Sequence, residues 1–279
     1  MLVTERWLES QGASYLPHGG FAGTAHLSHY TVDYRVWGEG EPIVLVPGLA
    51  GGMGLMGPLA SILSQHYKVI TYQLRGEDNC FAIRRPFGLQ DLVGDLREFI
   101  EYMQLESPTV FGVSFGGIIG LEYAARFPGR LGNLVLQGTG AKFEPSIMQK
   151  IAGTVLNRFP LPADNAFVNQ FFNVVFGKPQ QPGPLLDWVT RQIWSTDQSV
   201  MAHRFQLIET FNMDGKIDQI RVPTLVLSGG RDVLVSKRSL QALCRGIPQA
   251  HHVRMPQAGH LAAVTSPDII TDQVRSFLH

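Results

Sequence analysis

Three side chains in this 279-residue sequence are of the types that acyl transfer through a serine requires. Ser114 is the central residue of a Gly-x-Ser-x-Gly sequence, and Asp232 and His260 each follow a short predicted strand nearer the C-terminus. A serine hydroxyl is a weak nucleophile at neutral pH, so it needs a base to take its proton, and the base needs an acid to orient it. The three residue types therefore predict a nucleophile, an acid and a base, in that chain order.

The stretch around Ser114 predicts a strand, a sharp turn and a helix, with the serine at the turn. Residues 109–111 are apolar and β-prone, and residues 121–126 favour a helix. Gly112 and Gly116 are expected where the strand end and the helix start come too close for side chains. The helix N-terminus behind the serine would place a partial positive charge where an oxyanion forms. This context is the one in which a serine becomes a nucleophile.

Asp232 and His260 are each expected just beyond the end of a strand. Residues 224–228 form a buried apolar strand before the aspartate, and residues 251–255 form the last predicted strand before the histidine. In parallel sheets the functional groups lie past the carboxyl ends of the strands, so the three side chains are expected at one edge.

An oxyanion hole also needs two backbone N–H donors. We expect one from Phe115, which follows the nucleophile, and one from Leu49, in the glycine-rich loop at 47–52 that follows the strand at 43–46. Glycines in that loop would let the backbone approach a substrate closely.

Short apolar runs alternate with helical patterns through most of the chain, which predicts an α/β fold with a mostly parallel, doubly wound sheet. Residues 1–24 are expected to be irregular, and residues 25–37 to form two strands. The predicted strands of this sheet are 43–46, 67–72, 109–111, 134–136, 223–228 and 251–255. The predicted helices are 56–64, 89–103, 115–127, 236–244 and 267–277.

The alternation breaks between residues 141 and 218, where aromatic residues and prolines replace buried strand runs. This predicts a helical cap (lid) at 141–218, inserted into a core domain made of 1–140 and 219–279. A small insertion has little interior of its own, so a ligand cleft is expected between it and the core. Met53, Trp188 and Trp194 are the predicted substrate contacts, and the cleft is expected to be apolar.

Composition excludes several classes of function. Basic and acidic residues number 23 each, so the chain has no excess positive charge for nucleic acid or an anionic membrane. No metal-ligand cluster or nucleotide loop is present, and no cofactor is expected. Residues 42–67 lack charge, but their prolines and glycines argue against a membrane span. Cys80 and Cys244 form no disulfide framework, so we expect a cytoplasmic location, without excluding one disulfide. We also expect the protein to be a monomer or a homodimer.

With these motifs in place, the chain resembles a capped α/β-hydrolase of the esterase, lactonase and C–C hydrolase kind over about residues 25–279. The resemblance implies a Ser-His-Asp triad of Ser114, His260 and Asp232. Three features depart from the common pattern. Pro47-Gly48 stands where His-Gly is common, which removes a side chain that braces the oxyanion loop. Residues 73–76 are Gln-Leu-Arg-Gly rather than Asp-x-Arg-Gly. Glu77-Asp78-Asn79 stand where small residues are common, and the sequence suggests no function for this acidic pair. Arg75 could still tie loops together.

The expected activity is hydrolysis of a small to medium, largely apolar ester, thioester or lactone. C–C bond hydrolysis, or a lyase or haloperoxidase-type activity, would use the same groups. Two alternatives belong to other classes of function: a ligand-binding receptor on the same fold, and a scaffold whose cap binds a partner protein. Aspartate-nucleophile relatives are disfavoured because Ser114 occupies the turn.

Overall fold

A single eight-stranded sheet forms the centre of the molecule in the computed structural model, which describes residues 20–77, 86–158, 175–177 and 183–279. The spatial order is β1-β2-β4-β3-β5-β6-β7-β8. β1 and β2 are antiparallel to their neighbours, and all the other pairs are parallel. The strands are β1 (Phe21–His26), β2 (Thr31–Trp37), β3 (Pro42–Val46), β4 (Lys68–Tyr72), β5 (Thr109–Val113), β6 (Asn133–Gln137), β7 (Thr224–Gly229) and β8 (Ala250–Met255).

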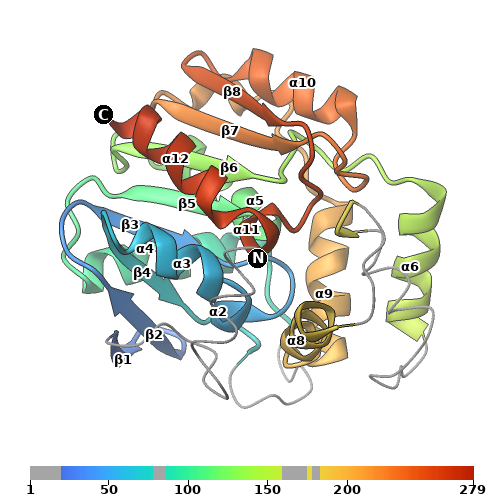
Figure 1. The fold of residues 1–279 in the computed structure, drawn as a ribbon, viewed down its shortest axis with the longest axis horizontal. Coiled ribbons are helices and arrows are strands. Elements are labelled where there is room, and N and C mark those ends of the chain that lie inside the picture. The colour runs from blue at the N-terminus through green and yellow to red at the C-terminus, as the bar shows by residue number, and fades with distance from the viewer. Residues whose placement is uncertain (1–19, 78–85, 159–174, 178–182) are drawn as a thin grey trace.

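Helices cover both faces of this sheet (Figure 1). One hydrophobic cluster joins the sheet to α4, α5 and α10, and a second joins it to α3, α11 and α12. The helices of the core are α2 (Gly52–Leu55), α3 (Gly57–Leu63), α4 (Leu89–Tyr102), α5 (Phe115–Arg126), the 3-10 helix η2 (Ile217–Gln219), α10 (Lys237–Gly246), α11 (Ala262–Thr265) and α12 (Pro267–Leu278).

Strand β3 shows how the apolar runs produce this double covering. Val44 and Val46 belong to the cluster with α4 and α5, while Ile43 and Leu45 belong to the cluster with α3 and α12. Successive side chains of a strand point to opposite faces, so a run without polar residues can be buried on both. The predicted α/β class and parallel sheet are thus confirmed.

In the described part of the segment between β6 and β7, three α-helices pack beside the sheet rather than on its faces (Figure 1). They are α6 (Ile147–Arg158), α8 (Pro184–Ile193) and α9 (Gln198–Glu209). These helices fall within the range 141–218 for which the sequence predicts a helical cap. No helix in the described residues is long and apolar enough to cross a membrane.

The N-terminal part of the fold differs from expectation. The first strand starts at Phe21, whereas the sequence predicts irregular chain through residue 24. β1 is an exposed edge strand that pairs on one side only, so its pattern carries little of the burial signal that reveals a strand. The short helices α2 and α11 were also not predicted. Cys80, Asp78 and the residues before Gly20 lie outside the described part of the chain.

Candidate active site

Ser114 occupies the tight turn between β5 and α5. Its backbone has φ 52° and ψ −111°, a strained conformation for a residue with a side chain, of the kind that costs about 1–3 kcal/mol. The two flanking glycines are required by close approach. A Cβ on Gly116 would lie 2.1 Å from the Val46 carbonyl oxygen, and one on Gly112 would lie 2.5 Å from the Gly116 carbonyl oxygen. Their predicted steric role is therefore confirmed.

The structure brings the serine, the histidine and the aspartate into one hydrogen-bonded chain. His260 Nε2 lies 2.8 Å from Ser114 Oγ, and His260 Nδ1 lies 2.9 Å from Asp232 Oδ2. Both distances are within the range for proton transfer between a nucleophile, a base and its orienting acid. The second oxygen of the aspartate accepts backbone N–H bonds from Leu234 at 2.8 Å and Val235 at 3.2 Å. Those bonds fix the carboxylate, so its free oxygen points at the imidazole.

Burial and charge act in opposite directions on this pair. Burial disfavours the imidazolium, but the Asp232 charge and its hydrogen bond outweigh that effect and raise the pKa of His260 above its ordinary value. Burial likewise acts to raise the pKa of Asp232. The imidazole and the Leu234 and Val235 N–H groups outweigh it and hold the pKa of Asp232 below its ordinary value. The aspartate therefore stays ionised at neutral pH and favours a charged histidine.

Residues at the end of the neighbouring strand β6 contact the backbone of both the serine and the histidine. The Gln137 side-chain nitrogen donates to the His260 carbonyl at 3.0 Å, and Thr139 Oγ1 donates to the Ser114 carbonyl at 2.9 Å. Gly138, with φ 65°, lies against the imidazole, since a Cβ there would be 3.1 Å from His260 Cε1. The residues at the end of β6 thus help to position the serine and the histidine, a role that the sequence did not indicate.

The two expected oxyanion donors lie at the same site. Leu49 and Phe115 both line the cavity that contains Ser114. Within the described chain, neither backbone N–H donates a hydrogen bond, so both are available to a bound oxygen. Phe115 is also the first residue of α5, whose N-terminal partial charge favours an anion there.

A cavity of about 250 Å³ opens between the core and the helical insertion, with the serine and histidine in its wall. Most of its lining is aliphatic or aromatic. The insertion contributes α6, through Ala152, Val155 and Leu156, and α9, through residues such as Met201 and Phe205. Such a chamber suits an uncharged, apolar ligand with one reactive polar group.

Of the three predicted substrate contacts, the structure places only Trp194 on this cavity. Met53 is half-buried on the single turn of α2, and the cavity is lined instead by Leu55 and Met56 from the end of that turn. Trp188 is 3% exposed and packs in the hydrophobic cluster where α8 meets α2. Residue type alone did not reveal which side of each short helix faces the chamber.

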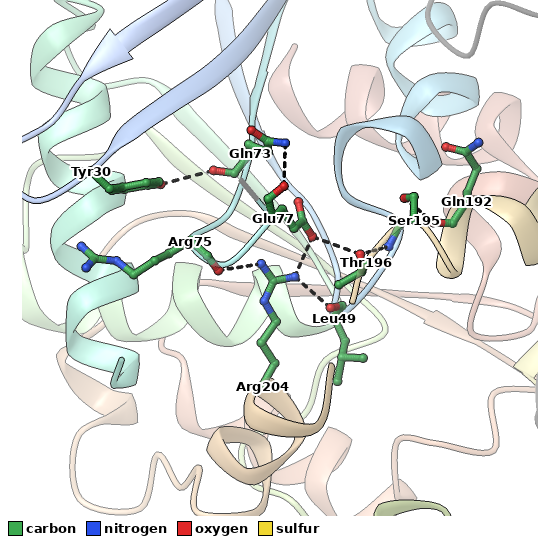
Figure 2. Close-up of polar contacts among 10 residues, drawn as sticks. Tyr30, Leu49, Gln73, Arg75, Glu77, Gln192, Ser195, Thr196 and Arg204 are labelled. Carbon is green, nitrogen blue, oxygen red and sulfur yellow. Dashed lines mark hydrogen bonds and ion pairs between the residues drawn. The ribbon is translucent and has the colours of Figure 1, made fainter. Parts of the chain in front are cut away.

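Sequence reasoning also missed a buried polar cluster beside the oxyanion loop, drawn in Figure 2. Arg204 of α9 is fully buried and forms an ion pair with Glu77 at 2.7 Å. Thr196 Oγ1 donates to Glu77 Oε1 at 3.4 Å and accepts from the Gly51 N–H at 2.9 Å. The available signal was weak: Arg204 stands four residues after the buried Val200, where α9 should be apolar.

Arg75 has the tying role that the sequence left open. Its guanidinium forms two hydrogen bonds with Asp95 of α4, at 2.9 Å and 2.5 Å, and lies 4.9 Å from the ring centroid of Tyr30. In the residues that the structure covers, no group of three or more His, Cys, Asp or Glu side chains is placed to hold a metal ion.

Comparisons with known proteins agree with this fold. A family described as alpha/beta hydrolase fold matches residues 41–267. A protein named as a carbamate hydrolase, RutD of Agrobacterium fabrum, is 24% identical over 260 residues, which cover 90% of this chain and 97% of that protein. A hydrolase from Pseudomonas aeruginosa superposes with a TM-score of 0.81 at 22% identity, covering 94% of this chain and 99% of the other. The enol-lactonase of Burkholderia xenovorans gives 0.72 at 23% identity, covering 92% and 99%.

Proposed function

Because this chain belongs to the α/β-hydrolase fold family, we propose that it is a serine hydrolase that cleaves small to medium, largely apolar carboxylic esters, thioesters or lactones. The observation that carries the proposal is the hydrogen-bonded chain Ser114–His260–Asp232, which ends in an apolar cavity. A fold alone does not determine an activity, whereas this arrangement has the parts that acyl transfer needs.

The reaction follows from the geometry. His260 Nε2 takes the Ser114 proton as Oγ attacks the substrate carbonyl carbon. The backbone N–H groups of Leu49 and Phe115 hold the oxyanion of the tetrahedral intermediate. His260 then protonates the leaving group, and the acyl enzyme forms. A water molecule gives a proton to the same nitrogen as it attacks the acyl carbonyl. His260 then returns that proton to Ser114 Oγ as the ester bond to the serine breaks and the acid leaves. Asp232 orients the imidazole and stabilises its cation in both halves.

The cavity supports the substrate class. Its wall combines the aliphatic residues of α6 with Phe205 and Trp194, and it has room for an acyl chain or ring rather than a polymer. Lys142 and Glu144 also line it, and each has a polar partner: the lysine pairs with Asp214, and the glutamate accepts from Ser236. An apolar ester therefore buries its chain without leaving a charge unpaired.

Carbamate hydrolysis is a second candidate, favoured by the named RutD relatives that match over 84% or more of this chain. The same serine, histidine and N–H donors serve a carbamate carbonyl, so the choice between the two lies in the leaving group and the chamber. C–C bond hydrolysis or a lyase reaction with the same groups, and ligand binding without turnover, remain the other candidates.

A labelling and turnover experiment tests the proposal. The native protein should react with a fluorophosphonate probe and hydrolyse p-nitrophenyl esters, and Ser114→Ala should lose both. Ser64→Ala, which removes a hydroxyl outside the cavity at the end of α3, is the matched control and should retain both. A folded native protein that neither labels nor turns over any ester or carbamate would refute the hydrolase assignment.

Acyl chain length provides the test of substrate class. Burying one methylene contributes about 0.8 kcal/mol, so kcat/KM should rise about fourfold per added CH₂ until the cavity is filled. A flat or falling series from acetate upward would contradict an apolar acyl site. A preference for aryl carbamates over the matched esters would favour the second candidate.

A further inference from the structure

The oxyanion loop of this protein is held from outside the core domain. Leu49 lies in the non-helical segment between β3 and α2, and such a segment fixes a single N–H direction only if other groups restrain it. The Pro47 side chain at the start of the loop has no hydrogen-bonding group. The restraint therefore has to come from residues elsewhere in the chain.

Arg204 supplies contacts on one side of the loop (Figure 2). Its Nη1 donates to the Leu49 carbonyl at 2.9 Å and to Glu77 Oε1 at 2.7 Å, and its Nη2 donates to the Arg75 carbonyl at 3.0 Å. The Leu49 carbonyl and the Leu49 N–H belong to adjoining peptide planes that meet at the Leu49 Cα. Fixing the carbonyl plane therefore leaves only rotation about the two backbone bonds of Leu49 to change the direction of its N–H.

The other side of the loop is held through the same carboxylate. Thr196 accepts from the Gly51 N–H and donates to Glu77, so Glu77 links Arg204 to the residue that restrains Gly51. The guanidinium also lies 6.0 Å from the ring centroid of Phe115, the residue that carries the second donor. One buried cluster thus contacts the loop before and after Ala50 and the start of α5.

A contribution to folding stability does not by itself explain the buried Arg204–Glu77 ion pair. Both side chains are nearly inaccessible, at 0% and 6% exposure, so both charges have lost their hydration. Replacing a buried ion pair with neutral side chains of similar size is often neutral or stabilising. Arg204 Nε also lacks a hydrogen-bond partner among the described residues, which adds a further cost. The directed contacts to two backbone carbonyls and a carboxylate use several N–H donors of one planar guanidinium, which an apolar side chain of similar size cannot supply.

We propose that Arg204, together with Glu77 and Thr196, is the positioning device of the oxyanion hole and holds the Leu49 N–H in its productive direction. The inference rests on the proposed hydrolase function. It assigns a role in the rate of the chemical step to a helix of the insertion, through a residue that does not touch the substrate.

The double variant Arg204→Met, Glu77→Gln tests this device with both charges removed. Lys216→Met, which breaks the ion pair with Glu122 at the far end of α5, is the matched control. Misplacing a catalytic group by about 1 Å can cost about 10²-fold in rate, so kcat of the double variant should fall by roughly 10–100-fold with KM little changed. The affinity of a trifluoromethyl ketone, whose serine adduct carries an oxyanion, should fall by the same factor. Lys216→Met should change neither.

Two further variants keep the test decisive. Arg204→Lys retains one charged donor without the planar fork and should recover part of the lost kcat. Thr196→Val keeps the shape of the side chain but loses the Gly51 contact, and it should lower kcat and ketone affinity together even if the Arg204 variants do not fold. If the double variant or a folded Thr196→Val had the same kcat and ketone affinity as Lys216→Met, the inference would be overturned. Absence of turnover in the native protein would instead refute the hydrolase function itself.

Discussion

Replacing Asp232 with asparagine tests the proposed mechanism at its least obvious member. One aspartate oxygen accepts from the Leu234 and Val235 N–H groups, and the other accepts from His260 Nδ1. Asparagine has only one acceptor oxygen. Two backbone donors compete for it against one imidazole, so the oxygen should stay with the backbone and the amide NH₂ should face the ring. His260 must then accept at Nδ1 and carry its proton on Nε2, which faces Ser114.

That tautomer cannot take the serine proton. The expected loss in kcat is about 10⁴-fold at neutral pH, the size of the effect when a triad base is held in the wrong tautomer. The residual rate would come from the oxyanion hole and substrate binding. Because both backbone N–H groups keep their acceptor, the free energy of unfolding should change far less, by about 1 kcal/mol or less for the altered contact with the ring.

The assay is p-nitrophenyl ester turnover beside urea unfolding of the same preparations. Asp268→Asn, an exposed carboxylate in the first turn of α12, is the matched control; it should keep native kcat and lose at most a few tenths of a kcal/mol. A ¹⁵N spectrum of the imidazole would report which nitrogen is protonated. An Asp232→Asn protein that stays within tenfold of the native rate would show that the aspartate does not set the tautomer.

The remaining predictions concern pH and packing. His260 must be neutral to act as a base and its pKa is raised, so kcat/KM should fall as pH drops through a midpoint above the ordinary histidine value; an acid limb centred below that value would contradict the ion pair. The same pKa shifts affect the free energy of unfolding. The contribution of His260 is lost as pH rises through its raised pKa, and the contribution of Asp232 is lost as pH falls through its lowered pKa. Gly116→Ala should destabilise by about 1–3 kcal/mol because its Cβ overlaps the Val46 carbonyl, whereas Gly94→Ala in open space within α4 should stabilise slightly; equal urea midpoints would refute the packing argument.

The parts of the fold that the sequence predicts are those with a burial signal that repeats. Strands such as β3 and β5 are almost entirely apolar, as burial of both faces requires, and α4 has one continuous apolar face that packs on the sheet. The strand ends then bring Ser114, Asp232 and His260 to one edge, because parallel strands end on the same side. β1 carries no such signal, since it is exposed on most of its length.

The residues around the chamber could not be predicted in the same way. A short helix such as α2 or α8 has neighbours on several sides, and its pattern does not say which neighbour is the cavity. Trp188 therefore packs in a cluster while Trp194 lines the chamber. The Arg204–Glu77 pair joins residues 127 positions apart on segments without a shared pattern. Each appears in the sequence only as a charge in an unexpected place.

Helix α9 both lines the cavity and contacts the oxyanion loop, whereas the sequence places the oxyanion loop in the core domain and the substrate contacts largely in the cap. Met201, Phe205 and Ile208 recur at intervals of three and four residues and line the cavity. Val200 and Arg204 lie on the adjacent face, where Val200 packs near Gly76 and Arg204 reaches the oxyanion loop. A helix is stiff, so a change that shifts one face moves the other. Substitutions that enlarge the chamber along α9 should consequently alter kcat as well as substrate preference, whereas equivalent substitutions on α6 should alter preference alone.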